Sequence, residues 1–211
     1  MNFEALAGAI IHDLKNQLQS VVAESERMLE QVPPEYHAAM QPFLSRTRRV
    51  HQDAMQLVTL YRLTQRGNFS SDDAWPADTA RHAAECVSVH YPDVLVETDI
   101  DGDCQGFYND FLLQMALTNL INNSAQAGAT EIHITAEEQG PDLVIRVEDN
   151  GPGFSETQLE GDFGNGEERG TGMGLYFNEL IMKHHSRPGR PATMIMANRA
   201  QGGACVTLTL P

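Results

Sequence analysis

The sequence DNGPGF fills residues 149–154 and lies one residue after residues 143–147, whose mostly apolar and β-branched side chains predict a strand. A carboxylate such as that of Asp149 only accepts hydrogen bonds, and at a strand end it suits the exocyclic amine of adenine. Gly151 and Gly153 let the backbone approach such a base closely. Asp-Asn-Gly is also common in simple turns, so the interpretation depends on the surrounding sequence.

Residues 119–125, with the sequence NLINNSA, lie within a helix predicted over residues 110–127. Asn119 and Asn123 are four residues apart and therefore share one face of that helix. A carboxamide oxygen is a suitable ligand for Mg²⁺, which takes a few protein oxygens together with waters and phosphates. Taken alone, the pair is more simply explained as part of a solvated helix face.

Residues 170–175, with the sequence GTGMGL, open a helix predicted over residues 175–184. Backbone N–H groups at a helix N-terminus bind phosphate. The stretch is not a dinucleotide fingerprint, because the strand and acidic partner of that motif are missing around it. Helix carboxamides, a strand-end carboxylate and a glycine-rich helix start, in this order, together indicate a nucleotide site.

The rest of the second half predicts helices and strands joined by antiparallel connections. Pro76 fits the first turn of a helix that runs to about His90. Further strands are predicted over residues 94–100, 131–136, 194–197 and 204–210. We expect an α/β sandwich, one mixed sheet covered on one face by helices, in a chain of the α+β class. His184 and His185, at a predicted helix end, are expected to be cations favoured by the helix dipole.

The first half predicts two long helices. Apolar residues recur at steps of three and four from Phe3 to Val32, where two prolines end the helix. A near-heptad pattern then runs from Met40 to Tyr61. The short connection makes the helices antiparallel neighbours. Since one hairpin buries such seams poorly, we expect two copies to form a four-helix bundle, and hence a homodimer.

A break in the helical period separates the two halves. The predicted organisation is a helical hairpin over residues 1–67, a linker over residues 68–74 and the sandwich over residues 75–211. The formal net charge of −15 argues against nucleic acid and anionic membranes as partners. No apolar run approaches the roughly 20 residues of a membrane span, and no signal peptide is evident. Three scattered cysteines fit free thiols, so a cytoplasmic location is expected.

The stretch IHDLKN, residues 11–16, places His12, Asp13 and Asn16 on the first helix. In isolation, His12 is most simply a surface histidine. Beside a nucleotide site, it becomes a candidate acceptor of a phosphoryl group.

These motifs resemble those of bacterial sensor histidine kinases, and the resemblance covers nearly the whole chain. Residues 12–16 resemble the H box of their dimerisation and phosphotransfer domain. Their ATP-binding domain, shared with gyrase, Hsp90 and MutL, carries an N box, a G1 box and a G2 box. Residues 119–125, 149–154 and 170–175 resemble these boxes, and residues 202–211 resemble the final strand.

The resemblance implies roles for the residues of the first helix. His12 would accept the phosphoryl group. Asp13 would hold its other ring nitrogen and act as a base. Asn16 would orient water when phosphate is removed from a partner receiver domain.

The resemblance also implies ATP and Mg²⁺ as ligands of the second domain. Asn123 would bind Mg²⁺ with Asn119 beside it. Asp149 would recognise adenine in a pocket shaped by Gly151 and Gly153. The triphosphate would be bordered by the loop that contains Gly170, Thr171, Gly172 and Gly174.

One position distinguishes members of this superfamily. Hydrolytic members resembling gyrase have a glutamate where this chain has Asn119, and an asparagine cannot take a proton from water. The resemblance therefore implies a histidine kinase that phosphorylates His12 and passes the group to an aspartate of a response regulator. Since no sensory module precedes His12 in this sequence, we expect the signal to come from a separate sensory protein, unless the sequence is a piece of a longer chain. A phosphotransferase or phosphatase with little use of ATP remains an alternative, because residues 155–169 form a short acidic lid. A non-enzymatic dimeric adaptor is another.

Overall fold

The structure is a computed structural model that describes residues 3–64, 69–160 and 173–211. Over residues 3–15, and at a few later helical positions, it describes the backbone alone. The chain divides by its internal contacts into two compact units, Met1–Gly67 and Asn68–Pro211. Within the described ranges, no helix has the length and apolar character needed to cross a bilayer.

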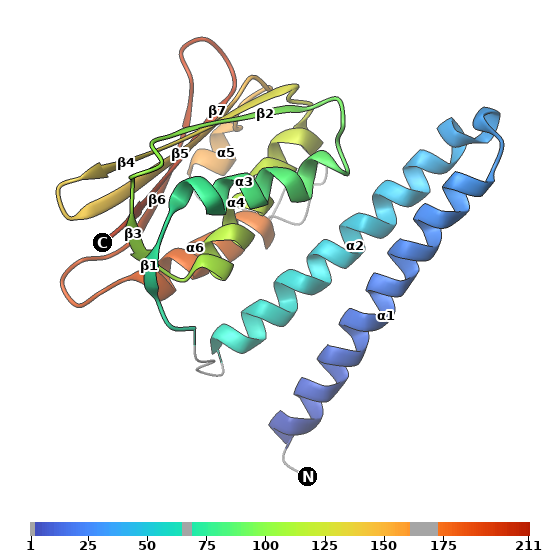
Figure 1. The fold of residues 1–211 in the computed structure, drawn as a ribbon, viewed down its shortest axis with the longest axis horizontal. Coiled ribbons are helices and arrows are strands. Elements are labelled where there is room, and N and C mark those ends of the chain that lie inside the picture. Colours follow the sequence, from blue (N-terminus) through green and yellow to red (C-terminus); the bar gives the residue numbers. More distant parts are fainter. Residues whose placement is uncertain (1–2, 65–68, 161–172) are drawn as a thin grey trace. The chain divides into compact units, whose positions relative to one another are not determined.

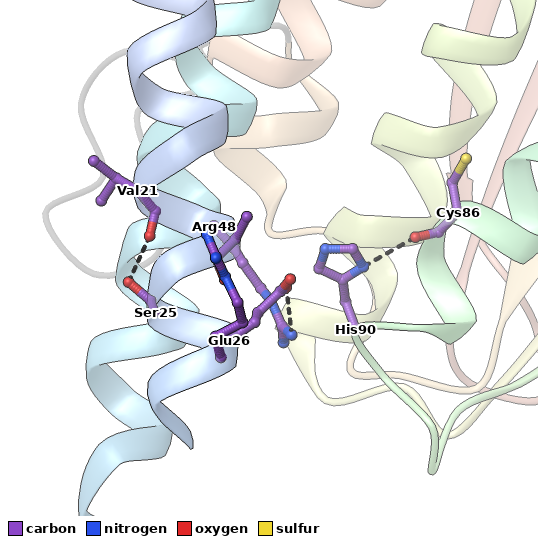
Figure 2. Close-up of polar contacts among 8 residues, drawn as sticks. Val21, Ser25, Glu26, Arg48, Cys86 and His90 are labelled. Carbon is purple, nitrogen blue, oxygen red and sulfur yellow. Dashed lines mark hydrogen bonds and ion pairs between the residues drawn. The ribbon is translucent and has the colours of Figure 1, made fainter. Parts of the chain in front are cut away.

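The N-terminal unit is an antiparallel pair of long helices (Figure 1). Helix α1 (Phe3–Gln31) ends before two prolines, the short 3₁₀ helix η1 (Pro34–Tyr36) makes the connection, and α2 (His37–Thr64) runs back. An ion pair joins the helices, in which Arg48 Nη2 lies 2.9 Å from Glu26 Oε1 (Figure 2). The buried Ser25 hydroxyl donates to the carbonyl of Val21 at 2.7 Å, so the helix itself satisfies this polar group.

Apolar side chains remain exposed in a line along each helix of the hairpin, and together they are called the exposed stripe. Its members are between 45% and 57% exposed and recur at steps of seven: Val21 and Met28 on α1, and Phe43, Val50 and Leu57 on α2. Residues seven apart lie along one line of a helix surface. Leu44 and Val58, by contrast, are buried. The hairpin therefore buries only part of its apolar pattern.

The C-terminal unit is built on a five-stranded mixed sheet with the order β2-β4-β5-β7-β6. Strands β2 and β4 are parallel and the other neighbours are antiparallel. The strand bounds are β2 (Leu95–Ile100), β4 (Glu131–Gln139), β5 (Asp142–Asp149), β6 (Thr193–Asn198) and β7 (Ala204–Leu210). A second, two-stranded sheet pairs β1 (Asp72–Ala74) with β3 (Gly106–Tyr108).

Three helices cover one face of the larger sheet (Figure 1). They are α3 (Pro76–Ser88), α4 (Asp110–Ala127) and α6 (Met173–His185), and a short helix, α5 (Glu156–Leu159), follows β5. The core lies between the helices and the sheet, where residues of α4 such as Leu117 and Ile121 pack with Ile134 and Ile145. Burial alternates along β7, as expected for a strand with one face on the core.

The predicted α+β class and the single mixed sheet with helices on one face are confirmed, and α4 has the predicted bounds. Strands β1 and β3 were not predicted, because three residues are too few to show alternation. Strand β1 lies in the segment predicted as a linker. Strands β4 and β5 extend past their predicted ends toward the turn at Gly140, whose φ of 64° suits glycine.

Candidate functional site

Asp149 is the last residue of β5, and it is buried, with 6% of the residue exposed. Its Oδ1 accepts hydrogen bonds from the backbone N–H groups of Gly151 at 2.8 Å and Ala204 at 3.0 Å. Its Oδ2 accepts from the hydroxyl of Ser124, on α4, at 2.6 Å. A carboxylate offers about four lone-pair positions. Three described donors thus fix this group and leave Oδ2 able to accept from a ligand amine.

The loop after Asp149 is held in place by side chains distant in sequence. Asn198 accepts from the N–H of Phe154 at 2.7 Å and donates to its carbonyl at 2.9 Å. Arg199 donates to the carbonyl of Asp149 at 2.9 Å and pairs with Glu148 at 3.2 Å. These contacts join the loop to the end of β6 and the β6–β7 connection, and they hold the backbone around the Asp149 carboxylate in place.

Two glycines around this loop have backbone conformations that other residues rarely adopt. Gly153 has a φ of +79°, and a Cβ there would stand 2.6 Å from Asn198 Oδ1. Gly203 has a φ of +95°, and a Cβ there would stand 1.8 Å from the carbonyl oxygen of Asp149. The first glycine was predicted as a pocket residue and the second was not. Gly203 permits the close approach that brings Ala204 N–H to the Asp149 carboxylate.

Asn150 anchors the other side of the same turn. Its Oδ1 accepts from the N–H groups of Thr130 at 2.9 Å and Glu131 at 3.0 Å, and its Nδ2 donates to the hydroxyl of Thr130 at 2.9 Å. The turn is therefore attached to the start of β4, while Asp149 is directed toward α4. The simpler alternative for residues 149–154 was an ordinary turn. An ordinary turn does not require a buried carboxylate that accepts three hydrogen bonds, so this arrangement favours a binding site.

The two predicted asparagines of α4 meet the first turn of α6. Asn119 is 2% exposed and its Nδ2 donates to the carbonyl of Gly174 at 2.8 Å. A Cβ at Gly174 would stand 2.9 Å from Asn119 Oδ1 and 3.3 Å from Asn123 Nδ2. The predicted residues Asn119, Asn123 and Gly174 therefore converge, and glycine keeps the space beside both carboxamides open.

Helix α4 connects the two parts of the candidate site. Asn123 lies at the carboxamide part, and the next residue, Ser124, binds Asp149 at the carboxylate part. The described residues contain no group of three or more His, Cys, Asp or Glu side chains that could hold a metal ion. A hard cation here would depend on carboxamide oxygens and on the phosphates of a ligand, as Mg²⁺ commonly does. The donor set fits that ion.

Several predicted residues cannot be placed in the site. Gly170, Thr171 and Gly172 lie outside the described residues. His12 and Asp13 belong to α1, but their side chains also lie outside the described part. Asn16 is described and is exposed on α1.

The prediction for His185 was wrong. This side chain is 6% exposed, and its Nε2 accepts from the N–H of Asn109 at 3.0 Å while Nδ1 contacts the carbonyl of Ile181 at 2.8 Å. Burial is the main cause that lowers the pKa of His185 below its usual range. His185 is therefore a neutral acceptor that ties the end of α6 to the start of α4. The exposed His184 contacts the carbonyl of Phe69 at 3.1 Å.

Comparison with known proteins gives a consistent result. Residues 109–211 match the family described as Histidine kinase-, DNA gyrase B-, and HSP90-like ATPase. The chain is 30% identical over 233 residues to the sensor protein KdpD of Escherichia coli (strain K12), covering 98% of this chain and 24% of KdpD. It is 31% identical over 128 residues to sporulation kinase B of Bacillus subtilis (strain 168), covering 58% of this chain and 29% of that protein.

A solved structure shows the same fold over the full chain. Full-length ShkA superposes with a TM-score of 0.65 at 18% identity, covering 100% of this chain and 46% of that one. Residues 109–211 of the C-terminal unit thus match an ATPase family of the histidine kinase, gyrase B and HSP90 type, and the unit has the fold of histidine kinase catalytic domains. More specifically, this match, the similarity to sensor histidine kinases and the shared fold support a histidine kinase core. It spans less than a third of the length of KdpD and of sporulation kinase B.

Proposed function

We propose that this chain transfers the γ-phosphoryl group of ATP to His12, from which it passes to an aspartate of a separate response-regulator receiver domain. The observation that carries the proposal is the Asp149 carboxylate, buried and held by three donors on the fold of a histidine kinase core. A fixed acceptor favours the amine of adenine over the carbonyl of guanine. The ShkA structure with this fold is a complex with AMPPNP, which supports a nucleotide ligand.

The second part of the site would serve the phosphates. Asn123, with Asn119 beside it, would hold Mg²⁺ through a carboxamide oxygen, and the bound ion would neutralise charge on the triphosphate. Gly174 leaves room for this at the first turn of α6. Gly170, Thr171 and Gly172 would complete the phosphate site. Gly151 and Gly153 would shape the adenine pocket, where Gly151 N–H already binds Asp149.

The proposed transfer has two displacement steps. A ring nitrogen of His12 attacks the γ-phosphorus, a P–N bond forms, and the bond to the bridging oxygen breaks, so that ADP leaves with the electron pair. Asp13 accepts the ring proton. The receiver carboxylate then attacks the same phosphorus and the P–N bond breaks, returning the electron pair to the His12 ring. Asn119 supports transfer over hydrolysis, since a carboxamide has no basic site to activate water.

The hairpin would form the dimerisation and phosphotransfer domain, residues 1–67, connected by residues 68–74 to the ATP-binding domain, residues 75–211. The stripe of exposed apolar residues on α1 and α2 supports a homodimeric four-helix bundle, because two copies would cover it. Removal of phosphate from the receiver is a second candidate activity. It is favoured by the exposed Asn16, about one turn after His12 on α1.

Incubation with Mg²⁺ and ATP labelled at the γ-phosphate tests the main proposal. We expect label on the protein that is stable in alkali and lost in acid, as a P–N bond requires. His12→Ala should abolish labelling without loss of nucleotide binding. Asp149→Asn should weaken nucleotide binding, because it replaces a carboxylate oxygen by an amino group at a position where the three hydrogen-bond donors require an acceptor. His82→Ala, at an exposed site on α3, is the control. Labelling of the His12→Ala variant would contradict the proposal.

Three further outcomes, none of which requires transfer from ATP, would favour the alternative functions of a phosphotransferase, a phosphatase or an adaptor. Transfer between a phosphorylated receiver and His12 in a chain that binds no ATP would favour a phosphotransferase. Loss of phosphate from the receiver that depends on Asn16 would favour a phosphatase. Receiver binding that survives both His12→Ala and Asn123→Ala, without any transfer, would favour an adaptor.

A further inference from the structure

The interface between α4 and α6 contains two buried carboxamides. Asn119 is 2% exposed, and Asn178, which the sequence did not single out, is 0% exposed. Apolar residues of the same helices, such as Leu120, Leu175 and Ile181, are also buried there. In such surroundings each amide requires hydrogen-bond partners, because an unpaired buried polar group is unfavourable.

The two amides form one connected chain of hydrogen bonds. Asn178 Nδ2 donates to the carbonyl of Ala116 at 3.3 Å. Asn178 Oδ1 accepts from Asn119 Nδ2 at 3.1 Å, and the same Nδ2 donates to the carbonyl of Gly174 at 2.8 Å. The chain thus begins on α4, crosses to α6, returns to α4 and ends at the first turn of α6.

Both ends of this chain are backbone carbonyls, which can only accept. The carbonyl of Ala116 requires the amino group of Asn178, so Asn178 Oδ1 is the atom left to face Asn119. That oxygen and the carbonyl of Gly174 both require the amino group of Asn119. The hydrogen-bond partners of each amide therefore determine which of its two terminal atoms is oxygen and which is nitrogen.

This orientation decides which atom of Asn119 faces the nucleotide site. A Cβ on Gly174 would stand 2.9 Å from Asn119 Oδ1, 3.1 Å from Asn119 Nδ2 and 3.3 Å from Asn123 Nδ2. Because both N–H groups of Asn119 are engaged by oxygens, Oδ1 is the atom of this amide that can act as an acceptor beside Gly174. An oxygen at this place suits a hard cation or its bound water, whereas an amino group would repel the ion. A flip of the Asn119 amide would exchange its oxygen and its amino group at this position.

We propose that Asn178 is a positioning residue for the phosphate part of the nucleotide site. It fixes the Asn119 amide so that oxygen faces the space beside Gly174, and it couples α4 to the first turn of α6. The proposal rests on the proposed role of Asn119 and Asn123 toward Mg²⁺ and the triphosphate. Asn178 itself would not contact the ligand.

The test compares Asn178→Val with Asn178→Thr. These side chains have nearly the same shape, but only threonine can accept from Asn119 and donate to the Ala116 carbonyl. With valine we expect the affinity for ATP and Mg²⁺ to fall about tenfold, as the loss of one such hydrogen bond allows. The affinity for adenosine, which reaches only the Asp149 part, should change less than about twofold. Threonine should restore most of the lost affinity.

A double-mutant cycle separates positioning from general packing. In an Asn119→Ala background, Asn178→Val should have little further effect on ATP and Mg²⁺, because the residue through which it acts is gone. Ile181→Val, also buried on α6, is the control for lost packing and should leave both affinities unchanged. Thermal unfolding monitors folding, and Asn178→Cys, a weak hydrogen-bonding replacement, takes the place of valine if that variant does not fold.

The outcomes distinguish this inference from the proposed function. If Asp149→Asn and Asn123→Ala leave ATP binding unchanged, the proposed nucleotide site is wrong and the inference falls with it. If those variants weaken binding, the inference alone is overturned by any of three results. These are an unchanged affinity in Asn178→Val, an equal loss for adenosine, and an undiminished effect in the Asn119→Ala background.

Discussion

Ser124 and Asp149 are joined by a 2.6 Å hydrogen bond from the Ser124 hydroxyl to Asp149 Oδ2, which links the C-terminal half of α4 to the end of β5. The bond is charge-assisted, and the acceptor is buried. It belongs both to the core of the domain and to the proposed adenine pocket. Its removal should therefore affect stability and ligand affinity together.

Ser124→Ala is expected to lower the free energy of unfolding of the domain by about 1.5–3 kcal/mol, the range for a hydrogen bond to a charged group. The affinity for adenosine should also fall, since one of three donors that fix the carboxylate is lost. Chemical denaturation and calorimetric titration measure the two effects. Ser88→Ala provides the same change at an exposed helix end, where the hydroxyl only donates to the carbonyl of Glu85, and should alter neither quantity appreciably. Unchanged stability and affinity in Ser124→Ala would contradict the role assigned to this bond.

Gly203→Ala is expected to destabilise the domain by about 3 kcal/mol or more, because the added Cβ would clash with backbone and not with a flexible side chain. The Cβ would stand 1.8 Å from the Asp149 carbonyl oxygen. Gly202→Ala is a closely matched control, with a similar φ of +91° but nothing within 4 Å of the added Cβ. It should lose only about 1–2 kcal/mol, for the left-handed conformation. Equal losses in the two variants, measured by denaturant unfolding, would refute the close-approach argument.

The candidate residues of the site could be singled out from the sequence, whereas the contacts that hold them in place could not. Asp149, Asn119 and Asn123 were found because their residue types and local spacing have a direct chemical meaning. Asn198 and Arg199 were missed because their partners, Phe154 and Asp149, are 44 and 50 residues away in sequence. Nothing in a one-dimensional pattern indicates such a contact. Gly202 and Gly203 were visible only as the first residues of the segment that resembles the final strand of the family.

Burial explains the other differences. His185 looked like a helix-end cation because sequence position does not reveal that α4 begins beside it, with the N–H of Asn109 directed at its ring. Asn178 was likewise hidden within an apolar helix pattern, where a single polar residue carries no signal of its partners. The bounds of α4 were predictable because a helix of 18 residues is long enough to show a pattern of apolar residues, whereas strands of three residues are too short to show alternation.

The stability of the C-terminal unit should depend on the protonation of His185. Burial lowers its pKa in the folded state below the ordinary value of 6.5, so the unfolded chain binds the proton more readily. This contribution to stability is complete above about pH 6.5 and is lost as the pH falls from there through the lower folded pKa. His185→Gln keeps an acceptor for Asn109 N–H without a titrating ring, and should flatten this part of the pH dependence.

Urea unfolding at several pH values between about 5 and 8 measures this effect as a difference between the wild type and His185→Gln. His82→Gln, on the exposed surface of α3, controls for the removal of a histidine and should retain the wild-type slope. A parallel pH dependence in wild type and His185→Gln would show that His185 is not the group responsible.

The hairpin should dimerise through the exposed stripe formed by Val21, Met28, Phe43, Val50 and Leu57. Val50 is 49% exposed in the single hairpin, so Val50→Asp should change the stability of a monomer little. In a bundle it would place a carboxylate in an apolar seam, and twofold symmetry would introduce it twice. We therefore expect the dimer dissociation constant to rise at least tenfold, which sedimentation velocity over a range of concentrations measures. Ser45→Asp adds the same charge to an exposed position of α2 outside the stripe and should leave the dimer intact. A wild-type chain that remains monomeric at high concentration, or equal effects of the two substitutions, would exclude this stripe as the dimer interface.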